Sequence, residues 1–552
     1  MNETGHGVVG THEQFFSRLL PPSRQAYNDD DLFDAAKAMD LPDTVGDGPD
    51  AEENLYVPAG YTYLGQFVDH DLTLDTTSTL NPNDPTPPTN LRTPAFDLDC
   101  VYGDGPAAQP YLYEPDGATL KVGWCLDDET KPDLIRNQDA SGKISATGRA
   151  IIGDKRNDEN SIVSQIQLAF IKYHNKMVDH FRTQHPNLKG AVLFSTARQE
   201  VRWSYQRMLV EDYLKRIVEK PVYEQFTSSW AEQGDNAYKL YPPELRSRIP
   251  LEFAGAAYRF GHSMVRVGYR MNKDTALPVF EFSGISDKSL AGFQPLPASH
   301  VIDDWGRFFP APGKKELWPG VQVDINAGQE QIKLADGGRP DLVRLQFAYK
   351  IDPNLTGPLG DLPASISDFD GGKERHLRQS YEGPALSLLN LRRGNKFQLA
   401  SGQRFAEAIG GNQQDMLKNT ELKIRVPSGD KWTFVDFPAG LRQRTPLWLY
   451  ILAEAQRKIV REWADPNGNK SQPVTEDFFM EDVGAWTQLG PVGGRIVLET
   501  FFGLLDADPR SYVNSAPVEW MPVVFEGEKH LPLTISRILL WTGLPITDAF
   551  GV

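Results

Sequence analysis

The chain has 552 residues, 40% of them hydrophobic and 11% aromatic, which is enough apolar material for a large globular core. Its formal net charge of −17 argues against nucleic acid or an anionic membrane as the partner. No apolar run approaches the roughly 20 residues that a membrane-spanning helix needs. The N-terminus shows no conventional signal peptide, so we expect a soluble protein, either cytoplasmic or exported by a leaderless route.

Residues 1–55 are polar and acidic and predict a flexible N-terminal lead-in. No linker or internal repeat divides the rest, so residues 56–552 are expected to form a single domain. Its two cysteines, Cys100 and Cys125, have no metal-type spacing. Helical periodicity dominates and strand alternation is scarce, which predicts a mainly α fold with few short strands.

The stretch "YLGQFVDHDLTL", residues 63–74, places many polar side chains within an apolar segment. On a helix, four of them share one face: Gln66, Asp69, His70 and Thr73. Asp71 points instead into the apolar half, where a carboxylate needs a cation or strong hydrogen bonds. The alternative is a surface helix whose polar face is simply solvated.

The next segments are irregular. Residues 81–94, "NPNDPTPPTNLRTP", are too rich in proline for helix or sheet. The segments "YLYEP" and "ATLKVGWCL" predict a minor hairpin. Long amphipathic helices then follow over residues 162–181 and 196–218, and further helices are expected at 252–268, 402–409, 446–462 and 490–505.

The segment "GDKRNDEN", residues 153–160, precedes the first long helix. Glu159 there is compatible with ordinary capping of a helix N-terminus. Arg156 is not, because a cation at that end opposes the helix dipole and needs another purpose.

The segment "EFAGAAYRFGHSMVRVGYRMN", residues 252–272, carries small residues on the helical face that holds His262. Such a face lets a flat, bulky group approach the backbone, and Arg259 and Arg266 could bind carboxylates on that group. The alternative is a core histidine with satisfied hydrogen bonds. The segment "LLNLRRGN", residues 388–395, read alone is a basic helix end.

Taken together and in this order, "GQFVDHD", "GDKRNDE", "AAYRFGHS" and "NLRRG" resemble the haem peroxidases of the animal type, the peroxidase–cyclooxygenase superfamily. The resemblance runs from about residue 55 to beyond residue 508 and includes the segment "GPVGGRIVLETFFGLL". The low cysteine count and the lack of a visible signal suggest a bacterial-type member.

The resemblance implies haem b as cofactor and hydrogen peroxide as substrate. His70 matches the distal histidine that moves a proton between the peroxide oxygens, and Arg156 the distal arginine that stabilises the departing oxygen. Gln66 matches the distal glutamine, which orders water or halide.

On the other side of the haem, His262 matches the proximal ligand of the iron. Asn390 matches the residue that accepts the other ring N–H of that histidine. Arg393 matches an arginine near a haem propionate, and Arg259 is a plausible second propionate partner.

Asp69 and Glu159 match the two carboxylates that become ester-linked to haem in many members of the family. The methionine that follows the second carboxylate in the chlorinating animal enzyme is Asn160 here. That departure argues against chloride oxidation at neutral pH.

The segment "TPAFDLDCVYG", residues 93–103, resembles the calcium loop of the family. The resemblance assigns the ion to Asp71 and to four positions of the loop: Thr93, the Ala95 carbonyl, Asp97 and Asp99. Hard oxygen donors of this kind suit calcium. Acidic alternation in a loop, taken alone, is usually just solvated.

The resemblance therefore implies a peroxidase that oxidises a halide or pseudohalide (bromide, iodide, thiocyanate) or small phenolic donors. A first alternative is a fatty-acid dioxygenase on the same scaffold. It is disfavoured because Arg259 stands where the cyclooxygenases have their radical-forming tyrosine. A second alternative is a calcium-stabilised adhesion protein that has lost haem.

Overall fold

The computed structural model describes residues 16–41, 52–74, 88–139, 141–145, 147–280, 289–312, 345–362, 385–410, 417–464, 471–480, 482–525 and 531–547. The α-helices of these residues are, in chain order, α1 (Asp29–Met39), α2 (Gly60–Leu72), α3 (Asp99–Tyr102), α4 (Ser161–Gln184), α5 (Gly190–Met208), α6 (Leu214–Ile217), α7 (Lys220–Gln233), α8 (Leu251–Gly255), α11 (Leu386–Lys396), α12 (Gly402–Ile409), α13 (Ala439–Arg442), α14 (Leu447–Ala455), α15 (Arg457–Trp463), α16 (Pro491–Ala507), α17 (Tyr512–Ser515) and α18 (Ile535–Thr542).

Strands within the described ranges form only short two-stranded antiparallel pairs. These pairs are β1 (Glu53–Pro58) with β6 (Phe347–Tyr349), β2 (Gly123–Trp124) with β3 (Pro132–Asp133), β4 (Gly268–Arg270) with β5 (Ala276–Pro278), and β7 (Lys423–Ser428) with β8 (Lys431–Asp436). The predicted hairpin is present, because Tyr113 and Leu120 form an antiparallel bridge just before β2. The mainly α fold predicted from the sequence is confirmed.

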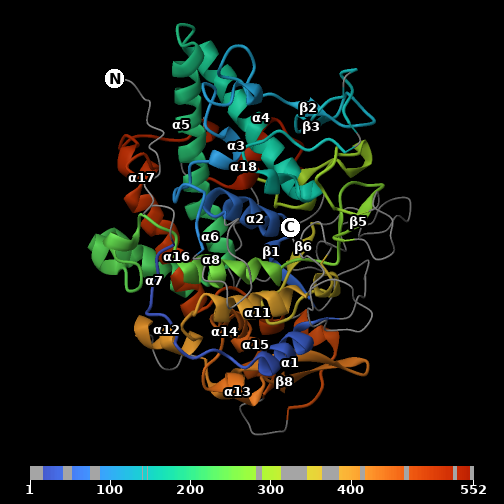
Figure 1. The fold of residues 1–552 in the computed structure, drawn as a ribbon, viewed down its shortest axis with the longest axis vertical. Helices are drawn as coiled ribbons and strands as arrows, with labels where there is room; N and C mark the ends of the chain where they lie inside the picture. The colour runs from blue at the N-terminus through green and yellow to red at the C-terminus, as the bar shows by residue number, and fades with distance from the viewer. Residues whose placement is uncertain are drawn as a thin grey trace.

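Helix α2 lies at the centre of the molecule, with α4 and α5 towards one end and α8, α11 and α14 towards the other (Figure 1). Its apolar residues Leu64, Phe67 and Val68 are completely buried. Phe67 stacks on Phe170 of α4, with ring centroids 4.8 Å apart. Helix α2 also contacts the 3-10 helix Ala257–His262, so the segments that carry His70 and His262 belong to one packed unit.

The predicted flexible lead-in is wrong for residues 16–41. Residues 29–39 form α1, which Asn28 caps by accepting a hydrogen bond from the Asp30 N–H at 2.8 Å. Leu32 and Met39 of this helix are fully buried in the main core. Three acidic residues in its first turn favour the helix through the dipole, which is why an acidic composition did not mean disorder here. Residues 1–15 and 42–51 lie outside the described residues.

The continuous helix expected over 252–268 is also wrong. Helix α8 ends at Gly255, Ala256 leaves helical geometry with φ −144° and ψ −67°, and a 3-10 helix continues over Ala257–His262. A Cβ on Gly255 would lie 2.7 Å from the ring of Phe397, so glycine is needed there, and glycine weakens a helix. The small residues near His262 therefore do not form one α-helical face.

Most of the other predicted helices are present. Helix α4 covers the stripe at 162–181, and α12 matches 402–409. The segment 196–218 contains a π-helical turn, Leu209–Tyr213, between α5 and α6, and 446–462 is divided at Gln456. The end of the proline-rich segment, from residue 88, is described and contains neither helix nor strand, whereas residues 81–87 lie outside the described part. Among the described helices, none combines the length and apolarity needed to cross a bilayer.

The stacking of Phe67 on Phe170 predicts a large cost for truncation at the centre of the core. We expect Phe67→Ala to lower the free energy of unfolding by about 3–5 kcal/mol, because it removes buried contacts and leaves a cavity. Leu540→Ala, at a side chain that is 53% exposed, should change it little. Thermal unfolding of the two variants makes the comparison, and equal shifts would contradict this account of the core.

Candidate functional site

Helix α2 presents its polar residues to the interior. His70 is 4% exposed and Asp71 is fully buried, while Gln66 and Asp69 are partly buried. The chain leaves the helix at Thr73, whose backbone is extended and whose hydroxyl donates to the Asp69 carboxylate at 3.1 Å. The alternative of a surface helix with a solvated polar face is therefore excluded.

A chain of hydrogen bonds fixes the tautomer of His70. At its far end Gln167 Nε2 lies 3.3 Å from the Cys100 carbonyl, which can only accept, so the Gln167 amide nitrogen faces it. Gln167 Oε1 then accepts from Asn157 Nδ2 at 2.9 Å, which leaves Asn157 Oδ1 to face His70 Nδ1 at 2.7 Å. Nδ1 must therefore carry the hydrogen, and Nε2 of the neutral ring keeps its lone pair.

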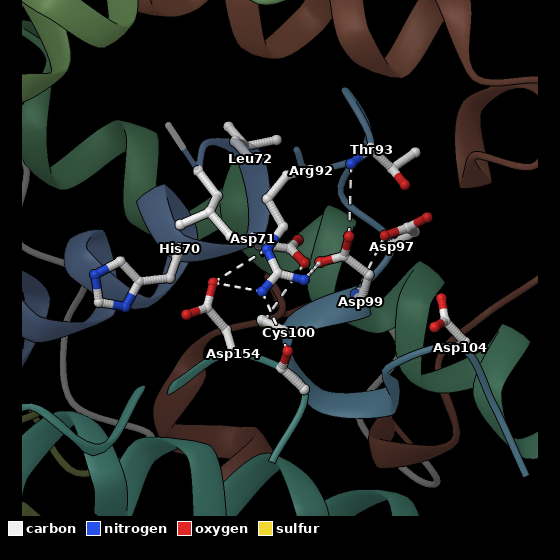
Figure 2. A network of polar contacts seen from close by, with 12 residues as sticks. His70, Asp71, Leu72, Arg92, Thr93, Asp97, Asp99, Cys100, Asp104 and Asp154 are labelled. Atoms are coloured by element: carbon white, nitrogen blue, oxygen red, sulfur yellow. Dashed lines mark hydrogen bonds and ion pairs between the residues drawn. The ribbon is translucent and has the colours of Figure 1, made fainter. Parts of the chain in front are cut away.

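His70 is also held in the neutral form. Burial and, after it, the cationic side chain of Arg156 lower the pKa of His70 to about 4. A neutral ring with a free Nε2 can accept a proton from a molecule beside it. In Figure 2 the His70 ring points away from the carboxylates of Asp71, Asp97 and Asp99.

Arg156 is held by one carboxylate and two carbonyls. Its Nε and Nη2 donate to Asp154 at 3.1 and 2.7 Å, and Nη2 also donates to the Thr73 and His70 carbonyls at 2.5 and 3.2 Å. Burial would raise the pKa of Asp154, but Arg156 and Arg92 outweigh burial and hold it well below its usual range. Among the described residues, Nη1 of Arg156 has no hydrogen-bond partner, so it is the nitrogen available to another molecule.

Gln66 joins the residues of the second motif. Its amide nitrogen donates to the Glu159 carboxylate, and its oxygen accepts from Asn160 at 3.0 Å. Burial raises the pKa of Glu159 to about 7, although the cation of Arg156 opposes the rise. The structure therefore brings Gln66, Glu159 and Arg156 to the same side of α2 as His70.

The third and fourth motifs meet at His262. Its Nδ1 lies 2.7 Å from the Asn390 amide, and burial together with the cations of Arg259 and Arg393 lowers its pKa well below the usual value. The ring is therefore neutral, as a metal ligand must be. Its Nε2 has no hydrogen-bond partner in the described part of the chain, and a Cβ on Gly261 would meet nothing within 4 Å. An open space beside a neutral histidine fits a flat iron cofactor.

One detail of this pair differs from expectation. The Asn390 amide nitrogen, not its oxygen, faces His262, because the oxygen accepts from Arg393 at 3.2 Å. Ligation through Nε2 needs the reverse arrangement, which a half-turn of the amide supplies.

The two arginines near His262 have different surroundings. Arg259 Nε donates to the Ala254 carbonyl at 2.9 Å. Arg266 forms an ion pair with Glu53 at 2.6 Å and donates to the Phe347 carbonyl at 2.7 Å, so it joins β1 and β6. The expectation that Arg266 binds carboxylates of a bulky group is therefore wrong, while Arg259 remains next to His262.

Carboxylate oxygens of Asp71, Asp97 and Asp99 all lie within 4.8 Å of one another. The backbone between Asp97 and Asp99 is not extended. Leu98 is left-handed, with φ 59°, and Asp99 begins α3. This strained residue turns the two loop carboxylates towards Asp71, and such strain persists only where the surroundings enforce it.

The donor set of this cluster fits a hard divalent cation. Burial and the two neighbouring carboxylates raise the pKa of Asp71 well above its usual value. Its Oδ2 is buried and has no hydrogen-bond partner among the described residues. Oxygen ligands at this density are those that calcium takes. Thr93 lies on the same loop, and its N–H points to Asp99 Oδ2 at 3.5 Å; Ala95 is buried two residues later.

Sequence reasoning missed four residues of this site: Arg92, Asp154, Asn157 and Gln167. Asp154 and Asn157 flank Arg156 in the segment 153–160, so an Asx-turn before the arginine was a usable signal for Asp154. A glutamine on the buried side of a long apolar stripe was a signal for Gln167. Nothing in the sequence around Arg92 indicates its role.

Comparison with known proteins gives three kinds of match. The family model for animal haem peroxidase matches residues 76–282, which include Arg156, Glu159 and His262. Human dual oxidase 1 is 24% identical over 268 residues, 46% of this chain and 16% of that protein. Heme peroxidase 2 of Caenorhabditis elegans is 26% identical over 117 residues, 21% of this chain and 16% of that protein.

Mouse thyroid peroxidase is 23% identical over 194 residues, 34% of this chain and 20% of that protein. The chain thus spans a fifth or less of the length of these relatives. Among solved structures, peroxidase A of Dictyostelium discoideum matches with a TM-score of 0.56 at 14% identity, covering 98% of this chain and 94% of that one. This match shows a shared fold over nearly the whole chain.

Proposed function

Because the chain belongs to the animal-type haem peroxidases of the peroxidase–cyclooxygenase superfamily, we propose that it reduces hydrogen peroxide with a bound haem. The observation that carries the proposal is the fixed, neutral His70, whose Nδ1–H is bonded to Asn157 at 2.7 Å. We further propose that the electron donor is a halide or pseudohalide (bromide, iodide or thiocyanate) or a small phenol.

In this proposal His70 transfers the peroxide proton, and Arg156 stabilises the charge on the leaving oxygen. Nε2 of His70 takes the proton from one peroxide oxygen, holds it, and returns it to the other as that oxygen leaves. Nη1 of Arg156 donates a hydrogen bond to the leaving oxygen and stabilises its negative charge. Gln66, held by Glu159 and Asn160, orders water or halide in the same space.

His262 would hold the haem iron through Nε2, with Asn390 against its other nitrogen. The haem supplies the redox chemistry, which reduces peroxide and oxidises the donor. Arg393 and Arg259 remain the candidates for the propionates. This proposal keeps every residue in the role that the resemblance gave it and adds Asn157 as the group that sets the tautomer of His70.

The role of His70 has a direct test. We expect His70→Ala to slow the reaction of the haem-loaded protein with peroxide by about 10²- to 10⁴-fold, the usual contribution of a general acid–base group. Stopped-flow absorbance of the haem band, with one equivalent of peroxide, measures this rate. His185→Ala, at an exposed histidine, is the control. A parental rate in His70→Ala would contradict the assigned role.

We also propose that calcium binds Asp71, Asp97 and Asp99, with Thr93 and the Ala95 carbonyl completing the ligands. The support is the buried Asp71 Oδ2, which has no hydrogen-bond partner within the described ranges, and the convergence of the three carboxylates. Because Asp71 follows His70 directly, the ion would hold the end of α2 in place.

Removal and return of the ion test this site. Calcium at about 100 times its dissociation constant should stabilise chelator-treated protein by about 2.7 kcal/mol, because it binds the folded state only. Asp71→Asn should lose most of this gain in thermal unfolding. Asp104→Asn, at an exposed carboxylate outside the cluster, should keep it (Figure 2). An undiminished gain in Asp71→Asn would exclude the proposed site.

Asp69 and Glu159 support a further proposal, that both form ester bonds to haem methyl groups with hydrogen peroxide as the oxidant. Each bond takes two electrons from a methyl carbon, and peroxide accepts them. After peroxide treatment, haem should stay with the parent chain in acidified organic solvent, while Asp69→Asn with Glu159→Gln should release it. Protein kept from peroxide is the control. Free extraction of haem from the treated parent would rule out the esters.

A further inference from the structure

Arg92 lies between the carboxylate cluster and the segment that carries Arg156. Its Nη1 donates to Asp99 Oδ1 at 3.1 Å, while Nε and Nη2 donate to Asp154 Oδ2 at 3.0 and 2.6 Å. A fourth bond joins Nη2 to the Gly153 carbonyl at 3.2 Å. Figure 2 shows the guanidinium spanning the two carboxylates, with Asp99 on one side and Asp154 on the other.

Asp154 is the shared partner of two arginines. Its side chain is 1% exposed, and Oδ2 accepts from both Arg92 and Arg156. Oδ1 accepts from the backbone N–H and Nε of Arg156, at 2.9 and 3.1 Å. A buried carboxylate that accepts six such bonds has one preferred orientation, and that orientation decides where the Arg156 guanidinium lies.

We propose that Arg92 is a positioning residue for the peroxide reaction: it orients Asp154, which in turn directs Arg156 Nη1 into the space beside His70. The inference rests on the proposed function, and it adds a residue that neither the sequence motifs nor that proposal assigned. The geometry suits arginine in particular, because only a planar group with several donors can bond Asp99, Asp154 and a carbonyl at once.

The same contacts predict the direction in which the loss of Arg92 changes the affinity of the cation site. Arg92 bonds Oδ1 of Asp99, one of the two oxygens that a cation could use there, and its positive charge lies 3.1 Å from that oxygen. Removing the charge therefore takes away a competitor for Asp99, whereas Arg92 makes no hydrogen bond to Asp71 or Asp97 in the described part of the chain. The loss of Arg92 should weaken the chemistry at Arg156 without weakening the binding of calcium.

The test uses Arg92→Met, which keeps most of the side-chain volume, in haem-loaded, full-length protein. We expect the reaction with peroxide to slow by about 10- to 100-fold, the scale of a misplaced catalytic group. Titration calorimetry with calcium on the same chelator-treated variant should give an affinity equal to the parent or tighter. Arg404→Met, at an arginine whose side chain is 69% exposed, should change neither quantity.

Arg92→Lys separates positioning from charge. An ammonium group can still bond Asp154, but it cannot span Asp154 and Asp99 in the same way, so the rate should recover in part. A parental rate in Arg92→Met would overturn the inference, and so would a calcium affinity that falls along with the rate, because that pattern indicates local unfolding. Failure of the parent itself to react with peroxide would instead refute the proposed function.

Discussion

The burial of Asp71 is the constraint on which this region of the structure depends. A carboxylate with no exposed surface is very costly unless cations or hydrogen bonds compensate it. Asp97 and Asp99 bring further negative charge within 4.8 Å, so the requirement grows instead of being relieved. Arg92 meets part of this requirement at Asp99, Arg510 lies 3.7 Å from Asp97, and the cation proposed for this cluster would add further positive charge.

The segment 153–160 is held next to α2 by its packing on α3. Gly153 packs so closely on α3 that a Cβ there would lie 2.5 Å from the Asp99 carbonyl and 2.6 Å from that of Cys100. The contact holds residues 153–160 beside the carboxylate cluster. From there Asp154 accepts hydrogen bonds from Arg92, and Asn157 bonds His70. Asn157 is also bonded to Gln167, which donates to the Cys100 carbonyl. The segment that contains Asp99 and Cys100 therefore supports both His70 and Arg156.

The residues that could be predicted from the sequence are those whose spacing places them on one face of a helix. The helical period alone predicted that Gln66, Asp69 and His70 share one face and that Asp71 points inwards. In the structure all four lie on α2, and Asp71 is fully buried. Residues whose role depends on contacts between distant segments gave no signal for their partners, even where helical spacing placed Gln167 on the buried side of α4. Asn157 and Gln167 are neutral amides whose bonds form only after folding. The break after Gly255 is set by Phe397, which is 142 positions further along the chain.

The two histidines of the site are oriented by different means. His70 ends a chain of amides that begins at a backbone carbonyl, and a carbonyl cannot reverse its role, so its Nδ1–H is imposed by the fold. His262 faces an amide whose oxygen is already taken by Arg393. Iron ligation through Nε2 requires that amide to turn, and Arg393 must then give up Asn390 for another partner. In the proposed function a haem propionate would be that partner, so the contact that holds the cofactor would also release Asn390 to accept the hydrogen of His262.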